Sequence, residues 1–347
     1  MNSGNIYLII IKNIILYFIL KGDDKMTNKQ NTKPTKKKNG SVISFINMKG
    51  GVGKTTLAVN IADKLVEKNY SVLVIDMDPQ FNSTQSLLLH KVILEKEQAC
   101  DKVNKKIDED DENKIATEQK STILYEELEK EKMTTFSLFS RNTLTEPHKN
   151  IITNIKENLD LIAGNLELAD EVSGDTANKV GVLSSFFDEF NIKNNYHFIL
   201  IDCPPTWSII THSSLFASNY YVIPSKVDLY SSIGIKLLEK KISEKLKEDY
   251  LFKRMNKPLI NLGIIFSLYH KNVKAEENRK SSLIKEFPDF PFFSTPLPYL
   301  PSVPTRFVMF SDSKNNSNYD ELKNSIEKIT EELIGKIIEK EEDNDAK

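Results

Sequence analysis

The chain has 347 residues, a formal net charge of −2 and two cysteines. A chain of this length can bury one large α/β core, and its near-neutral charge excludes a strongly basic coat for nucleic acid. Cys100 and Cys203 have neither the spacing of a metal site nor the number that a disulfide framework needs. We therefore expect a reducing, cytoplasmic compartment.

The N-terminal residues are apolar and then basic. Residues 5–20 are fewer than the roughly 20 that a membrane-spanning helix needs, Lys12 lies near their centre, and no small-residue cleavage site follows. We expect residues 1–25 to be a leader that is not translated, with the protein starting at Met26; a hydrophobic interfacial anchor is the alternative. Residues 26–40 carry lysines and no acid, which predicts a flexible basic arm that either contacts phosphates or only aids solubility.

A glycine-rich turn follows the first strand pattern. Residues 41–47 form an uncharged β-branched run, and residues 55–68 place leucine and isoleucine at helical spacing. Between them, Gly50, Gly51 and Gly53 leave the backbone N–H groups free to turn toward a phosphate at the helix N-terminus. This strand, turn and helix predict a phosphate-binding loop in which Lys54 reaches the β- and γ-phosphates and Thr55 ligates Mg²⁺. The predicted ATP-binding residues are Gly50, Gly51, Val52, Gly53, Lys54, Thr55 and Thr56.

Two further buried strand patterns end in aspartates. The run at 72–75 leads to Asp76 and Asp78, and the run at 196–201 leads to Asp202. Ligands bind at the carboxyl ends of strands in open parallel sheets, so we expect these carboxylates to face the γ-phosphate and its metal. A plain turn signal is the alternative reading of Asp-Met-Asp-Pro taken by itself.

The segment KGGVGKT, residues 49–55, resembles the signature of the deviant Walker A ATPases, while 76–80 and 198–202 resemble their Walker A′ and Walker B motifs. The resemblance implies that Lys49 crosses a dimer interface to touch the ATP of the other subunit, beside the catalytic Lys54. It implies that Asp78 orients the attacking water and that Asp76 and Asp202 organise the Mg²⁺ shell through water. A solvated loop lysine is the alternative for Lys49.

The remaining chain alternates between strands and helices. Residues 91–132 are rich in Glu, Lys and Asp, which predicts an insertion, partly helical and partly disordered, with a solvated face rather than a docking surface. We further predict a strand and helix over 158–171, a helix over 182–190, a strand from 220, a basic amphipathic helix over 233–246 and a strand over 260–269. An acidic tail is expected over 336–347. By the resemblance, the segment 295–298 runs beside the adenine, with Pro298 and Tyr299 as candidate contacts.

The segments DPQ, DCPP and YVIPSKVDLYSSIGIKLL resemble the ParA/Soj branch of the MinD/ParA superfamily. This implies a P-loop NTPase fold over 41–335, with a mostly parallel sheet flanked by helices on both faces. It also implies an ATPase with Mg²⁺, a homodimer with ATP, non-specific binding to double-stranded DNA, stimulation by a ParB-like partner, and a cytoplasmic, nucleoid-associated location. Candidate DNA contacts are Lys236, Lys240, Lys241, Lys245, Lys271, Lys274, Arg279 and Lys280. A MinD-like positioning ATPase on a membrane is the alternative, and a metabolic ligase is a distant third.

Overall fold

The computed structural model describes residues 39–103, 111–140, 151–171, 179–254, 257–301, 309–313 and 316–345. The expected leader and nearly all of the basic arm lie outside these residues. In the described part of the chain, no helix combines the length and apolar character that a membrane crossing requires.

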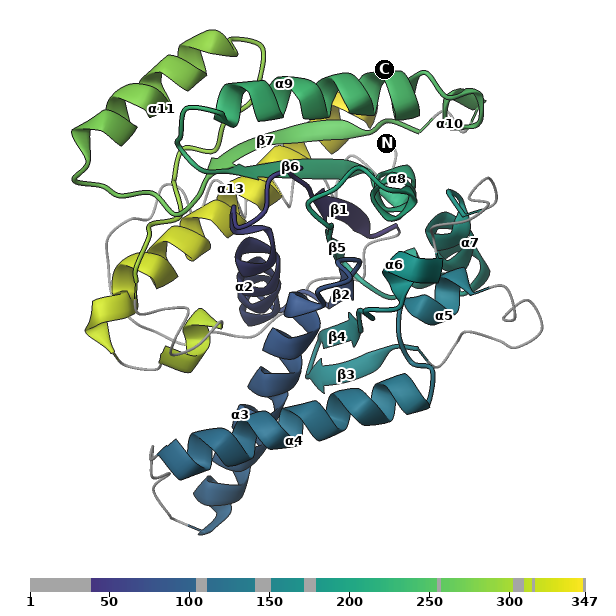
Figure 1. The fold of residues 1–347 in the computed structure, drawn as a ribbon, viewed down its shortest axis with the longest axis vertical. Coiled ribbons are helices and arrows are strands. Elements are labelled where there is room, and N and C mark those ends of the chain that lie inside the picture. Colours follow the sequence, from purple (N-terminus) through teal and green to yellow (C-terminus); the bar gives the residue numbers. More distant parts are fainter. Residues whose placement is uncertain are drawn as a thin grey trace, which may run out of the picture. The chain divides into compact units, whose positions relative to one another are not determined.

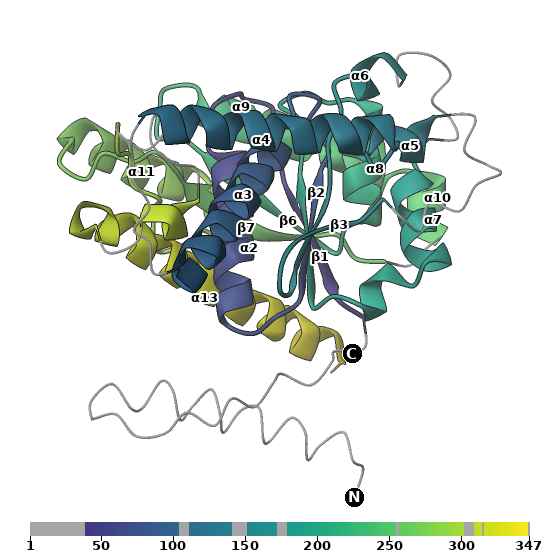
Figure 2. The ribbon, with the colours of Figure 1, turned by 90° about the horizontal axis from the view of Figure 1, so that it is seen from below.

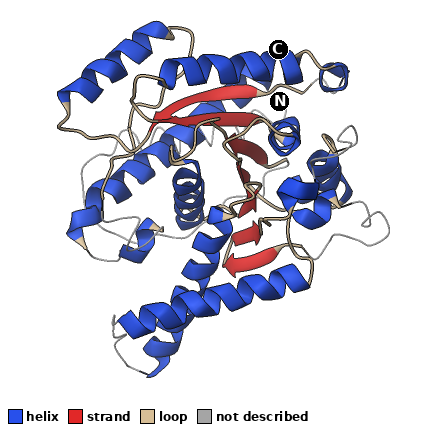
Figure 3. Cartoon of the chain, viewed as in Figure 1, coloured by secondary structure: helices blue, strands red, loops and turns tan. Residues whose placement is uncertain are grey.

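A seven-stranded sheet runs through the centre of the fold in the order β3-β4-β2-β5-β1-β6-β7 (Figures 1 and 3). All neighbouring strands are parallel except β3, which pairs antiparallel with β4 at one edge. The strands are β1 Ser41–Phe45, β2 Val72–Asp76, β3 Thr153–Lys156, β4 Leu159–Ile162, β5 Phe198–Asp202, β6 Tyr220–Ser225 and β7 Ile260–Phe266. Every residue of β1, β2, β5 and β6 is buried, which explains why these strands read as continuous apolar runs.

Helices connect the strands and cover both faces of the sheet. They are α2 Lys54–Glu67, α3 Asn82–Val103, α4 Asp111–Lys130, α5 Phe136–Phe139, α6 Leu168–Glu171, α7 Val182–Glu189, α8 Ile209–Ala217, α9 Ser231–Ile242, α10 Tyr250–Arg254, α11 Lys274–Glu286 and α13 Asp320–Asp345. Shorter turns are η3 Ile192–Asn194, η4 Ser243–Lys247, η5 Phe310–Ser313 and η6 Ser317–Tyr319. The predicted fold class, a P-loop type of mostly parallel sheet between helices, is confirmed.

Each face of the sheet has its own hydrophobic core. Side chains of α2, α3 and α13 pack with one set of strand residues, including Ile43 and Val74. Side chains of α7, α8 and α9 pack with the alternate set, including Val42 and Leu73. The helices accordingly lie on opposite sides of the strands (Figures 1 and 2). Since successive strand residues point to opposite faces, this division follows directly from the strand period.

The arrangement of β1, β2 and β5 brings the predicted site together. These three strands are neighbours, and Asp76 at the end of β2 is the register partner of Asp202 at the end of β5. Phe45, the last residue of β1, is also aligned with Asp202. The glycine turn after β1 therefore begins at the same edge of the sheet as both carboxylates.

Two regions differ in detail from the sequence-based boundaries. Within residues 91–132, the described residues are largely helical: α3 continues to Val103, and α4 packs against it as the second arm of a hairpin. The helix α13 runs through the expected start of an acidic tail at 336, and Ile337 is buried against the core. The apolar side chains of α13 continue to Ile338, and the helix extends beyond them through mostly charged residues to Asp345.

Candidate active site

The turn between β1 and α2 has the backbone of a phosphate-binding loop. Gly51 and Gly53 have φ values of +63° and +79°, which L side chains rarely adopt, and Gly53 is the N-cap of α2. Ser267, just beyond β7, donates a hydrogen bond of 2.6 Å from its hydroxyl to the carbonyl of Val52. The loop is thereby fixed to the sheet, and its N–H groups join the positive end of the α2 dipole as an anion site.

The Lys54 side chain lies folded inside this loop. Its residue is only 6% exposed, and its Nζ is 3.5 Å from the carbonyl oxygen of Lys49. Burial lowers the pKa of Lys54, while the nearby carboxylates Asp202 and Asp78 act in the opposite direction. A buried ammonium facing two carboxylates is ready to neutralise the charge of a bound triphosphate.

Asp202 is fully buried and accepts hydrogen bonds from two hydroxyl groups. Its Oδ2 accepts hydrogen bonds of 2.7 Å from the hydroxyls of Thr55 and Ser83. Its Oδ1 is buried and has no hydrogen-bond partner among the described residues. Burial raises the pKa of Asp202 to about 6, against the hydrogen bonds from Thr55 and Ser83. An orphaned carboxylate oxygen beside a threonine hydroxyl is a donor set that suits Mg²⁺, so these residues fit the predicted metal.

Asp76 and Asp78 have different surroundings. Asp76 Oδ2 accepts 2.8 Å hydrogen bonds from both the backbone N–H and the hydroxyl of Thr84, and burial followed by the charge of Asp202 raises its pKa. Asp78 instead begins a tight turn: its Oδ1 accepts from the N–H of Gln80, and its carbonyl accepts from the N–H of Phe81 at 2.8 Å. Asp76 is thus locked into the sheet edge, whereas Asp78 is held by the geometry of a turn.

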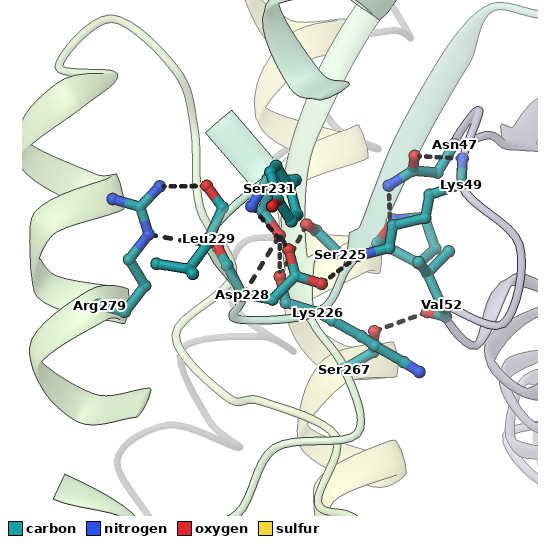
Figure 4. A network of polar contacts seen from close by, with 12 residues as sticks. Asn47, Lys49, Val52, Ser225, Lys226, Asp228, Leu229, Ser231, Ser267 and Arg279 are labelled. Carbon is teal, nitrogen blue, oxygen red and sulfur yellow. Dashed lines mark hydrogen bonds and ion pairs between the residues drawn. The ribbon is translucent and has the colours of Figure 1, made fainter. Parts of the chain in front are cut away.

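Lys49 points away from this cluster and toward the loop after β6 (Figure 4). It forms an ion pair with Asp228, in which the Lys49 side chain is 44% exposed and the Asp228 side chain 32%. Burial tends to raise the pKa of Asp228, but hydrogen bonds from Lys49 and Ser231 outweigh it, so the pKa is lowered. Asn47 supports the same region by accepting from the Lys49 N–H at 2.9 Å and donating to the carbonyl of Pro224 at 2.7 Å.

Comparison with known proteins agrees with this geometry. Residues 40–254 match the family model described as AAA domain. The chain belongs to this family. An uncharacterized protein of Methanocaldococcus jannaschii is 31% identical over 257 residues, which make up 72% of this chain and 82% of that protein. The chromosome-partitioning ATPase Soj of Treponema pallidum is 25% identical over 304 residues, covering 86% of this chain and 98% of Soj.

Among solved structures, a putative plasmid partition protein of Borrelia burgdorferi bound to AMPPNP matches with a TM-score of 0.59. It is 20% identical and covers 86% of this chain and 100% of that one, a level of identity at which the match shows the fold. Together with the KGGVGKT loop, these relatives place this AAA domain chain in the ParA/Soj type of the MinD/ParA superfamily. The chain is an ATPase, with ATP as substrate and Mg²⁺ as metal.

The loop that carries Asp228 is held by the neighbouring helix α11. The guanidinium of Arg279 donates to the carbonyls of Asp228 and Leu229, at 3.2 and 3.4 Å (Figure 4). It also donates to the hydroxyl of Ser232 at 3.2 Å. The hydroxyl of Ser231 donates at 2.9 Å to the Asp228 carboxylate. This AAA domain therefore presents Lys49 on a pair of loops whose shape is fixed by contacts within the chain.

The candidate adenine contacts separate in the structure. Pro298 lines a cavity of about 610 Å³ together with Tyr269, Lys271, Thr295, Pro296, Glu321, Asn324, Ser325 and Lys328. Tyr269 in the lining of this cavity stands two residues after Ser267, whose hydroxyl contacts the phosphate loop. Tyr299 is not among its lining residues; its ring lies against His270, with 4.8 Å between the ring centroids. Pro298 thus has a surrounding that suits its expected role better than Tyr299 does.

The candidate DNA contacts already have partners in the fold in most cases. Three pair with carboxylates: Lys236 with Glu286 at 2.8 Å, Lys271 with Glu321 at 3.5 Å and Lys240 with Glu244 at 3.7 Å. Two lie over aromatic rings: Lys241 over Trp207 and Lys280 over Phe266 and Tyr269. Arg279 holds the Asp228 loop. Lys245 lies in η4, and Lys274 begins α11.

Several site residues escaped the sequence analysis. Ser83 and Thr84 lie in the first turn of α3, after the turn that follows β2, and their hydroxyls reach the carboxylates of Asp202 and Asp76. Asp228 stands three residues after β6, and the rule that ligands gather at the carboxyl ends of parallel strands could have found it. Gly164, where an added Cβ would lie 3.0 Å from Asp76 Cγ, has no comparable sequence signal.

Proposed function

We propose that this chain is an ATP-dependent DNA-partitioning ATPase, whose ATP-induced sandwich dimer binds DNA without sequence preference. A ParB-like partner stimulates hydrolysis, and hydrolysis releases the DNA. The observation that carries the proposal is the position of Lys49: it stands on the phosphate loop, yet its side chain faces outward, 44% exposed, while Lys54 is buried inside the loop. A lysine placed in this way can reach a nucleotide bound by a second copy.

The surface next to Lys49 supports association with another subunit. Leu229, Tyr230, Ile233 and Leu237 follow Asp228 along the loop and α9, and each is more than half exposed. Contiguous apolar side chains at the surface of a soluble domain commonly mark an interface. In the dimer, Lys49 would exchange Asp228 for the phosphates of the partner's ATP, because a triphosphate offers more negative charge than one carboxylate.

Within one subunit, the residues of the phosphate loop and the carboxylate cluster have separate roles in ATP hydrolysis. The loop N–H groups and Lys54 hold and neutralise the phosphates, while Thr55 and Asp202 would hold Mg²⁺, which supplies charge neutralisation when bound. Asp78 orients the attacking water, and Asp76 keeps the carboxylate edge in place through Thr84. Phosphoryl transfer depends mainly on such positioning and electrostatic stabilisation.

The relatives support the cellular role. A similarity that covers 98% of the chromosome-partitioning ATPase Soj of Treponema pallidum spans the whole of a partition protein rather than its nucleotide loop alone. A cytoplasmic, nucleoid-associated location follows from DNA binding. The DNA contacts would come from lysines of α9, η4 and α11, with Lys245 and Lys274 as the first to test.

The test is binding of the full chain to random duplex DNA with ATP, with ADP and without nucleotide, at two salt concentrations. We expect binding with ATP only, weakened steeply by salt because phosphate contacts release counterions. Lys49→Ala should abolish it, whereas Lys120→Ala, an exposed lysine on α4, should leave it unchanged. DNA binding that is equal in all nucleotide states would contradict the proposal, and ATP-dependent binding to anionic vesicles without DNA binding would favour the membrane alternative.

A further inference from the structure

The charged helix α4 contacts the turn beside the active site through an aromatic pair. The ring of Tyr125 in α4 stacks on the ring of Phe81, with 4.6 Å between centroids and 3° between the ring planes. Tyr125 and Leu128, one turn further along, are partly buried against the core that α2 and α13 share. This side of α4 is therefore packed, although the composition of the segment predicts a solvated face.

Phe81 belongs to the turn that carries Asp78. The N–H of Phe81 donates to the carbonyl of Asp78 at 2.8 Å, and the carbonyl of Phe81 accepts from Gln85 at 3.1 Å in the first turn of α3. Phe81 has φ of +40°, a left-handed conformation that strains a non-glycine residue. A strained residue persists only where its surroundings hold it, so the contacts of the Phe81 ring decide whether the turn keeps its shape.

A second contact joins α4 to the same region. Glu129, one turn after Tyr125, accepts a hydrogen bond of 3.1 Å from the side chain of the buried Asn165. The preceding residue, Gly164, lies so close to the turn that an added Cβ would be 2.8 Å from Phe81 Cβ. The end of α4, the loop after β4 and the Asp78 turn thus pack on one another without spare room.

We propose that Tyr125 is a positioning residue for ATP hydrolysis, acting through Phe81 to hold the turn that places the Asp78 carboxylate. This inference rests on the proposed role of Asp78. Tyr125 has no contact with the phosphate loop in the interactions of the described residues, so it acts on the water-orienting carboxylate and not on the affinity for ATP. The α3–α4 hairpin is then part of the catalytic framework rather than a solvated addition.

The test separates kcat from KM. Replacing Tyr125 by alanine removes the ring that packs on Phe81, and the turn can relax toward a less strained backbone. Because sub-ångström to ångström displacements of catalytic groups cost large factors in rate, we expect kcat for ATP to fall about tenfold or more while KM changes less than about twofold. Tyr125→Phe keeps the stack and should retain the wild-type kcat. Ile123→Ala, at a 53% exposed position of the same helix, is the matched control and should also do so.

Two further variants make the outcome decisive. In Phe81→Ala, the Tyr125→Ala change should have little additional effect on kcat, since the two rings act as one unit. If Tyr125→Ala does not fold, Tyr125→Leu is judged by the same criteria, because it keeps apolar volume but not the flat stack. Unchanged kcat in a folded Tyr125→Ala or Tyr125→Leu protein would overturn the inference.

The same assay distinguishes this inference from the proposed function. Asp78→Ala should bind ATP but lose hydrolysis. If Asp78→Ala is inactive while the Tyr125 variants are fully active, the hairpin has no positioning role, and the ATPase assignment stands. If Asp78→Ala hydrolyses ATP normally, the role of Asp78 is wrong, and the positioning role of Tyr125 fails with it.

Discussion

The carboxylate cluster and the Lys49 loop lie at the same edge of the sheet, yet they are built in opposite ways. Asp76 and Asp202 are fully buried, and neighbouring hydroxyls from Thr55, Ser83 and Thr84 hold them. Lys49 and Asp228 are partly exposed and hold each other in an ion pair. The first arrangement resists rearrangement because each change would bury an unsatisfied polar group. The second can exchange partners at low cost, because exposed ion pairs contribute little.

Under the proposed function, this difference suits distinct tasks for the two regions. A buried, fully packed cluster suits chemistry, which needs atoms held in place. An exposed pair beside exposed apolar side chains suits association, which needs a surface that another molecule can reach. Substitutions in the first region should therefore change stability and hydrolysis, and those in the second should change subunit association.

The largest effect is expected where the buried region lacks room. Gly164→Ala would place a Cβ 2.8 Å from Phe81 Cβ and 3.0 Å from Asp76 Cγ, and overpacking of this kind costs about 1–3 kcal/mol. Gly234→Ala, inside α9 of the exposed region with nothing within 4 Å of the new Cβ, should stabilise by up to about 1 kcal/mol. Urea unfolding of both variants measures the free energies of unfolding. Equal changes in the free energy of unfolding for Gly164→Ala and Gly234→Ala would show that the two regions do not differ in packing.

A smaller effect concerns the pH dependence of the buried region. Burial raises the pKa of Asp202 from 3.8 to about 6 in the native state. Between these values the native protein binds more protons than the unfolded chain, so the nucleotide-free protein gains stability as pH falls from 7 toward 5. Asp202→Asn lacks this titration and should be more stable than the wild type at pH 7. The difference in stability between the two proteins should be smaller at pH 5. Thermal unfolding without Mg²⁺ measures this difference in stability at each pH. A difference that does not change with pH would refute the predicted titration of Asp202.

Asp228 provides the comparison for this titration. Its pKa is lowered, so its contribution to stability is present at neutral pH and is lost only as pH falls through the acidic range of an ordinary aspartate. The difference in stability between Asp228→Asn and the wild type should consequently stay constant between pH 7 and 5, unlike that of Asp202→Asn.

The strand-end carboxylates of the buried region could be predicted from the sequence, whereas the pairing of Lys49 with Asp228 could not. The positions of Asp76 and Asp202 follow from the uncharged strand patterns that they end, because parallel strands bring their carboxyl ends to one edge of the sheet. Lys49 and Asp228 are 179 residues apart, and only the order β1-β6 in the sheet makes them neighbours. The stack of Tyr125 on Phe81 depends on the packing of α4 back along α3. The charged composition of residues 91–132 gives no indication of this tertiary contact.

The smallest expected effect tests whether the Lys49–Asp228 pair restrains association. Asp228→Asn frees Lys49 from its partner within the subunit, and exposed ion pairs of this kind are worth up to about 1 kcal/mol. The ATP concentration at half-maximal dimerisation should therefore fall by no more than about fivefold, measured by sedimentation with a non-hydrolysable ATP analogue. Glu331→Gln breaks another partly exposed pair, with Lys68 on the α2 and α13 side of the sheet, and should change nothing. Dimerisation that becomes weaker in Asp228→Asn would mean that Asp228 builds the interface instead of competing with it.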